Sequence, residues 1–241
     1  MIRLACLCLL LLPTLSNAAC RQALALGLDV SGSVDEFEYR LQMDGVATAL
    51  NSAAVQEVLF AQPDAPIRIT VFEWSSPNDL KIVQPWITLN SPADLAIATA
   101  AMNNHGRRIK QATTAIGSAL EAGFAMLATQ QECWRRTLDL SGDGKSNTGP
   151  RPQDISDADM PDGTVVNGLV IGSGDVNAGD DRFVDVKELS SYYEAYVIRG
   201  PGAFVEVALG FETYAAAMER KLLRELQSIA IGQNMHGPEM P

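Results

Sequence analysis

Residues 23–35 of the chain read ALALGLDVSGSVD, and this stretch decides the fold. Its first eight residues, 23–30, form a short apolar run that predicts a buried β-strand. The run leads into Asp29-x-Ser31-x-Ser33, in which alternate positions carry a carboxylate and two hydroxyls. Gly32 permits a tight backbone path, so a turning chain can direct all three oxygens to one point. Taken alone, the pattern equally predicts a loop that caps the following helix, with Ser33 or Asp35 as the N-cap.

Predicted helices and strands alternate along the rest of the chain. Strands are expected at residues 23–30, 67–74, 80–89, 134–140, 164–171 and 204–209. Helices are expected at residues 35–52, 53–61, 91 to about 103, 114–131, 184–197 and 211–230. The turn at 75–79 is too short for a crossover, so strand 80–89 should run antiparallel to its predecessor, and Pro85 indicates an edge strand. The pattern predicts an α/β fold: a doubly wound, mostly parallel six-stranded sheet with one antiparallel edge strand and helices on both faces.

Three polar segments should meet at one edge of this sheet. In doubly wound folds, ligands bind at the carboxyl ends of the strands, near the point where the strand order reverses. The segments are the motif at 29–33, the pair Thr113-Thr114 and the pair Asp143-Gly144, which together offer two carboxylates and, with one of the two threonines, three hydroxyls. Oxygen donors without sulfur or imidazole suit Mg²⁺ or Mn²⁺. We therefore expect a site for one of these cations.

The same segments resemble the three-part motif of the von Willebrand factor A family. Residues 29–33 look like its DxSxS motif, residues 114–120 like its threonine motif, and Asp143-Gly144 like its aspartate-glycine motif, in the same order. The family has a metal-ion-dependent adhesion site (MIDAS), and its fold is the doubly wound sheet expected above. By that resemblance the metal ligands would be Asp29, Ser31, Ser33, Thr114 and Asp143.

The resemblance also implies a role for each ligand. Ser31, Ser33 and Thr114 would coordinate the metal directly, whereas Asp29 and Asp143 would contact it or its bound waters. A carboxylate of a protein partner would complete the octahedron. The family pattern usually has Gly where this chain has Thr113, so the choice between the two threonine hydroxyls stays open.

The whole predicted domain is similar to an uncharacterised bacterial family of exported von Willebrand A-like proteins. The resembling segments are residues 28–35, 73–75, 133–147, 192–193 and 200–204.

The N-terminal residues 1–19 have the features of a removable secretory signal. Arg3 is followed by an apolar run at 4–12 and by small residues up to Ala19. The run is far shorter than the roughly 20 residues that a membrane span needs. We expect a domain at 20–231, a flexible tail at 232–241, and a periplasmic or secreted protein that is not inserted in a membrane once the signal is removed.

Two cysteines remain outside the predicted signal, Cys20 and Cys133. Each precedes a predicted strand, so they would lie at the same end of the sheet if the two strands are parallel neighbours. A disulfide there is geometrically reasonable and fits an oxidising compartment. The alternative is a lipid anchor on Cys20, although Asn17 stands where a lipoprotein signal prefers an aliphatic residue.

The composition disfavours several classes of function. The formal net charge of −11 disfavours binding to nucleic acid. The two histidines lie in polar or tail segments and no CxxC occurs, which disfavours a zinc site or a His-based triad. We expect a binding module for a protein partner with an acidic side chain, and not an enzyme. The alternatives are a hydrolase that uses the metal as a Lewis acid, and a scaffold with a vestigial site.

Two further polar segments are interpreted as ordinary surface. Asp175, Asp180 and Asp181 offer a second cation site, but a solvated turn is the preferred interpretation. His105, Arg107 and Arg108 are expected to form an exposed polar loop.

Overall fold

The computed structural model describes residues 20–107, 112–172 and 181–233. The predicted signal, Asp175 and Asp180 lie outside these ranges, as does the predicted tail from residue 234 onward. The last helix extends to Gln233, two residues into the predicted tail. Within the described ranges, no helix has the length and apolar character needed to cross a membrane.

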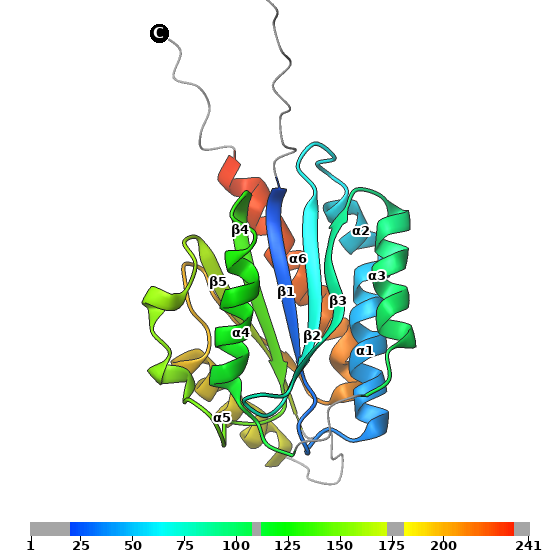
Figure 1. The fold of residues 1–241 in the computed structure, drawn as a ribbon. Helices are drawn as coiled ribbons and strands as arrows, with labels where there is room; N and C mark the ends of the chain where they lie inside the picture. Colours follow the sequence, from blue (N-terminus) through cyan, green and yellow to red (C-terminus); the bar gives the residue numbers. More distant parts are fainter. Residues whose placement is uncertain (1–19, 108–111, 173–180, 234–241) are drawn as a thin grey trace, which may run out of the picture.

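One six-stranded sheet forms the centre of the molecule, with the strand order β3-β2-β1-β4-β5-β6 (Figure 1). The strands are β1 (Cys20–Asp29), β2 (Ile67–Trp74), β3 (Leu80–Leu89), β4 (Cys133–Gly142), β5 (Thr164–Ile171) and β6 (Val205–Ala208). β3 runs antiparallel to β2 at one edge, and the other neighbouring strands are parallel. The predicted fold class, including the antiparallel edge strand, is confirmed.

Helices cover both faces of the sheet. They are α1 (Glu36–Asn51), α2 (Ala53–Leu59), α3 (Pro92–Asn104), α4 (Ile116–Ala128), α5 (Asp181–Tyr196) and α6 (Tyr214–Gln233), with short 3₁₀ turns at Pro152–Asp154, Asp157–Asp159 and Phe211–Thr213. Helices α1, α2, α3 and α6 share one buried apolar cluster, and α4 and α5 share a second cluster on the opposite face. The sheet therefore lies between two helical layers.

Strand β1 lies in the middle of this arrangement. All ten of its residues are buried, because helices cover both faces and a strand flanks each side. Complete burial explains why this strand reads as a continuous apolar run instead of an alternating one. The chain goes from β1 to β2 on one side and later returns to β4 on the other. The strand order therefore reverses between β1 and β4.

A disulfide joins the amino ends of these two strands. Cys20 and Cys133 are in register in the parallel pair, and their Cα atoms are 4.3 Å apart. The predicted disulfide is confirmed, and the lipid anchor on Cys20 is incompatible with it. Both cysteines are buried, so solvent has little access to the bond.

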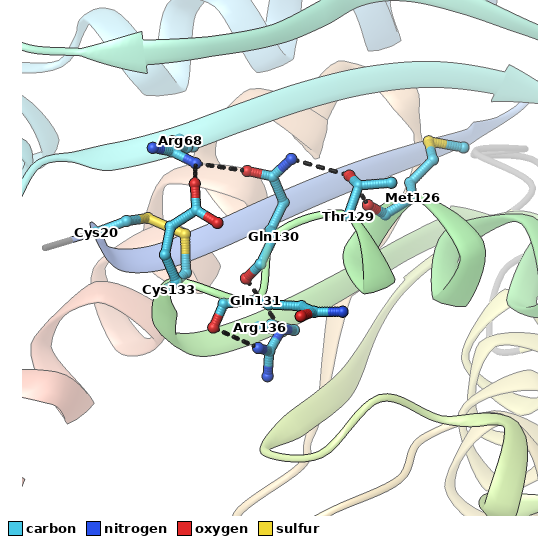
Figure 2. A network of polar contacts seen from close by, with 9 residues as sticks. Cys20, Arg68, Met126, Thr129, Gln130, Gln131, Cys133 and Arg136 are labelled. Carbon is cyan, nitrogen blue, oxygen red and sulfur yellow. Dashed lines mark hydrogen bonds and ion pairs between the residues drawn. A yellow bond between two sulfur atoms is a disulfide. The ribbon is translucent and has the colours of Figure 1, made fainter. Parts of the chain in front are cut away.

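A polar network lies beside this cross-link, on the turn between α4 and β4 (Figure 2). Arg68 Nη1 donates to Gln130 Oε1 over 3.1 Å and forms an ion pair with Glu132. Arg136 Nε donates to the carbonyl oxygen of Gln130, also over 3.1 Å. These contacts tie β2 and β4 to the turn that carries Cys133.

Candidate metal centre

The three predicted motif segments meet at the carboxyl edge of the sheet. Asp29 is the last residue of β1, and Asp143 directly follows β4. Because the strand order reverses between these two strands, their ends diverge into separate loops and leave room for a ligand. Thr114 reaches the same place from the segment that precedes α4.

Hydrogen bonds link the oxygens of the DxSxS loop to the end of β4. Ser31 N donates to Asp29 Oδ1 over 2.9 Å, which folds the loop back over the strand end. The hydroxyls of Ser31 and Ser33 are 3.3 Å apart, and Ser33 Oγ donates to Asp143 Oδ1 over 2.7 Å. The side chains of 29–33 and Asp143 therefore form one continuous group.

The cap of α1 is formed by Asp35 and not by the serines. Glu38 N donates to Asp35 Oδ1, and Asp35 N donates to Glu38 Oε2, both over 2.8 Å. This is a capping box, in which two terminal N–H groups of the helix are satisfied reciprocally. The helix-cap interpretation of the motif is therefore correct for Asp35, and it leaves the Ser33 hydroxyl available to Asp143.

Of the two threonines, Thr114 points into the site. Its Oγ1 donates to Ser31 Oγ over 3.2 Å, whereas the Thr113 hydroxyl lies 2.6 Å from Ser76 Oγ. The backbone of Thr114 is held by Asn147, whose Oδ1 accepts from Thr114 N and whose N donates to Thr114 O, each over 2.9 Å. These bonds explain why α4 begins at Ile116, two residues later than predicted.

Burial controls the electrostatics of the two carboxylates. Asp29 is completely buried, and burial, assisted by the charge of Asp143, raises its pKa to about 8 against the hydrogen bonds from Ser31. Burial also raises the pKa of Asp143, opposed by the hydrogen bond from Ser33. The charge of a divalent cation would favour the ionised form of both groups, because a nearby opposite charge lowers the pKa of a carboxyl group.

The donor chemistry also fits a cation. Asp29 Oδ2 is buried and has no hydrogen-bond partner among the described residues. Nowhere in the described part of the chain do three or more His, Cys, Asp or Glu side chains gather as metal ligands. The site instead combines two carboxylates with three hydroxyls, a set of oxygen donors that suits Mg²⁺ or Mn²⁺.

Comparison with known proteins places this arrangement in a family. A family described as "Protein of unknown function (DUF1194)" matches residues 19–230. The chain belongs to this family. None of the curated proteins matches the DUF1194 chain.

Solved structures show that the fold is that of von Willebrand factor A domains. Proximal thread matrix protein 1 from the mussel byssus is 17% identical over 88% of this chain and 49% of its own, with a TM-score of 0.58. The von Willebrand factor type A protein from Catenulispora acidiphila is 16% identical over 86% of this chain and 43% of its own, with a TM-score of 0.55. The DUF1194 chain thus spans about half the length of these proteins.

A further structure of the mussel protein is described as having a zinc-occupied MIDAS motif. It is 17% identical over 88% of this chain and 48% of its own, with a TM-score of 0.53.

Sequence reasoning missed an arginine that holds the DxSxS loop of the DUF1194 domain. Arg107 Nη1 donates to the carbonyl oxygen of Val34 over 2.6 Å, and its Nη2 donates to those of Val30 and Ser31 over 2.8 and 2.9 Å. The guanidinium thus accounts for a side-chain hydrogen bond to each of three carbonyl oxygens of this loop. The prediction that Arg107 belongs to an exposed polar loop was wrong, and Arg108 lies outside the described residues.

The neighbouring His105 is also not an exposed loop residue. Its Nε2 lies 3.3 Å from Oε1 of Glu73, a completely buried carboxylate in β2. Tyr39 Oη of α1 donates to the same Oε1 over 2.5 Å. This cluster joins α1 and β2 to the segment after α3, and it brings Arg107 to the DxSxS loop. A lone carboxylate in the apolar strand 67–74 was the sequence signal that could have indicated it.

Proposed function

We propose that this chain is an exported binding module that holds Mg²⁺ or Mn²⁺ at Asp29, Ser31, Ser33, Thr114 and Asp143, and that docks an acidic side chain of a protein partner on the metal. The convergence of the buried carboxylate of Asp29, the half-buried carboxylate of Asp143 and three hydroxyls on the end of β1 carries this proposal. When bound, the cation supplies a positive charge with a coordination position open to a partner's carboxylate.

The chain's own residues have separate tasks in this proposal. Ser31, Ser33 and Thr114 present hydroxyl oxygens to the cation. Asp29 and Asp143 supply the negative charge that attracts it, and Asp143 keeps Ser33 in place through their 2.7 Å hydrogen bond. The zinc-occupied MIDAS motif described for the mussel protein supports a divalent cation at the corresponding place of this fold.

Binding, and not catalysis, is the function that the site supports best. Hydrolysis at a metal centre needs a general base beside the bound water. Among the described residues, His105 is the one histidine, and it faces Glu73 instead of the metal site. The disulfide supports export, since such bonds persist in oxidising compartments.

Calorimetric titration of the purified protein with Mg²⁺ and Mn²⁺ tests the metal site. We expect saturable binding of one ion to the wild type and its loss in Asp29→Ala. Asp64→Ala is the matched control, because Asp64 is exposed in the turn before β2, at the opposite end of that strand from the site. Equal affinity of the wild type and Asp29→Ala would refute the proposed ligand set.

Affinity capture from a periplasmic extract tests the partner. Retention should require Mg²⁺, disappear with EDTA, and disappear with immobilised Asp29→Ala but not with Asp64→Ala. Replacement of the partner's metal-binding Asp or Glu by Asn or Gln should then abolish binding to the wild type. Capture that persists in EDTA contradicts docking through the metal.

A further inference from the structure

Tyr193 of α5 lies over strands β5 and β4, with its hydroxyl directed towards the candidate metal centre. Its ring is completely buried and lies over Gly168 of β5, where a Cβ atom would stand 2.7 Å from Tyr193 Cδ1. Its hydroxyl lies over Gly142 of β4, where a Cβ atom would stand 2.5 Å from Tyr193 Oη. Both distances are shorter than a side chain tolerates. Two glycines on neighbouring strands therefore provide the space that the tyrosine fills.

The Tyr193 hydroxyl and the Asp29 carboxylate line the same small space. The Cβ position on Gly142 that lies 2.5 Å from Tyr193 Oη lies 3.1 Å from Asp29 Oδ2. Both oxygens are buried, and neither has a hydrogen-bond partner among the described residues. Buried polar groups in native proteins are almost always paired, with protein or with ordered water. Two such atoms beside one gap can satisfy each other, directly or through one water.

The chemistry of the pair determines which atom donates. A phenolic hydroxyl ordinarily keeps its proton up to a pH of about 10, so Tyr193 has a proton to donate at neutral pH. A carboxylate that serves a cation accepts hydrogen bonds and does not donate them. Oδ1 of Asp29 already accepts from Ser31 N. Oδ2 is thus the atom left for a second donor.

We infer that Tyr193 is a positioning residue for the metal centre: its hydroxyl donates to Asp29 Oδ2, directly or across one water held over Gly142. This inference rests on the proposed function, because it concerns the orientation of a proposed ligand. Donors behind a metal-binding carboxylate fix its orientation, and their loss typically costs 10- to 100-fold in metal affinity. Tyr193 acts through Asp29 and does not contact the cation.

Tyr193→Phe tests the inference, with Tyr214→Phe as its matched control. Tyr214 is also completely buried, and its hydroxyl lies 2.9 Å from Ser141 Oγ, next to Gly142 in β4 but in the other apolar cluster. Titration with Mg²⁺ should give a dissociation constant about 10- to 100-fold weaker for Tyr193→Phe. Tyr214→Phe should stay within about twofold of the wild type while its melting temperature falls. A twofold or smaller change in Tyr193→Phe, or equal losses in both variants, overturns the inference.

A double-mutant cycle separates this inference from the proposed function. Unfolding of metal-free wild type, Tyr193→Phe, Asp29→Ala and the double variant measures the coupling between the two side chains without any cation. A stabilising coupling supports the hydrogen bond, and additivity of the two changes overturns it. If the wild type binds no Mg²⁺, the proposed function fails, and the cycle still decides whether Tyr193 holds Asp29.

Discussion

Ser33 Oγ donates a 2.7 Å hydrogen bond to Asp143 Oδ1, although 110 residues separate the two. The bond joins the loop after β1 to the end of β4, on the two sides of the point where the strand order reverses. The donor set that we propose for the metal is consequently held together by the chain's own hydrogen bonds. Binding of a cation there would require little reorganisation of the chain, which favours affinity.

The metal-free protein should become less stable as the pH rises from about 4 to about 8. Asp29 has a pKa of about 8 in the folded chain against an ordinary value of 3.8. Between these values the folded chain holds a proton that the unfolded chain has released, so the free energy of unfolding falls with rising pH. The loss from this group is at most about 6 kcal/mol. Asp29→Asn should flatten the dependence and be more stable than the wild type at pH 8.

Urea unfolding at several pH values, with EDTA, measures this difference between the wild type and Asp29→Asn. Buried Asp139, whose pKa burial raises to about 7, contributes a slope of the same sign to both proteins and cancels in the comparison. Saturating Mg²⁺ should restore the stability of the wild type at pH 8, because a ligand that binds only the folded state stabilises it. Parallel curves for the two proteins count against a protonated Asp29.

Thr114→Ala and Thr113→Ala should differ in metal binding. The Thr114 hydroxyl contacts Ser31 Oγ in the site, whereas the Thr113 hydroxyl contacts Ser76 outside it. We expect Thr114→Ala to weaken Mg²⁺ binding by at least about tenfold, and Thr113→Ala to leave it unchanged. Calorimetry of both variants checks this, and a larger effect of Thr113→Ala would reverse the assignment.

Arg107→Ala should lower both stability and metal affinity. The guanidinium satisfies three carbonyls of the DxSxS loop, and its removal leaves them without their charged donor. A cost of roughly 1–3 kcal/mol in the free energy of unfolding follows. Arg151→Ala is the control, because that side chain is exposed and its ion pair within the described residues is with Asp154. Urea unfolding and Mg²⁺ titration should show lower stability and weaker metal binding for Arg107→Ala, and no change for Arg151→Ala.

Removal of the disulfide should destabilise the fold without changing the ligands. The bond closes a loop between residues 113 positions apart, and its loss typically costs about 2–5 kcal/mol. Cys20→Ala with Cys133→Ala should show this loss in urea and still bind Mg²⁺. Intact mass under non-reducing conditions is the accompanying check. An acyl adduct on Cys20 of the natural protein is the result that would exclude the disulfide.

Lys221→Met should be strongly destabilising. Lys221 Nζ is completely buried, 2.7 Å from Asp139 Oδ2 and 2.6 Å from Glu225 Oε1, and it joins α6 to β4. Removing its charge takes the paired cation from the buried Asp139 carboxylate and one partner from Glu225, at a cost of roughly 3–5 kcal/mol. Adding Asp139→Asn and Glu225→Gln should recover most of the loss, as measured by thermal unfolding. If Lys221→Met alone is as stable as the wild type, this account is contradicted.

The fold could be predicted from the sequence because its determinants are local. Apolar runs such as 23–30 and the short turn before β3 specify the strands, and the alternation with helices specifies a parallel sheet. The positions of Asp29, Thr114 and Asp143 followed because each is adjacent to an element whose end is predictable.

The supporting residues could not be predicted, because their roles depend on contacts between distant segments. Arg107 is 77 residues from Val30, which it contacts, and its segment reads as ordinary polar loop. The inferred contact between Tyr193 and Asp29 depends on Gly142 and Gly168, which lie beneath the tyrosine on neighbouring strands, and periodicity in the sequence does not reveal that register.

The cross-link between Cys20 and Cys133 also has a mechanical consequence. The candidate metal centre and the disulfide lie at opposite ends of the same two parallel strands. A partner that pulls on Asp29 or Asp143 loads β1 and β4 along their length. Because the far ends are covalently joined, the two strands cannot slide past each other under that load, and tension must be shared between them.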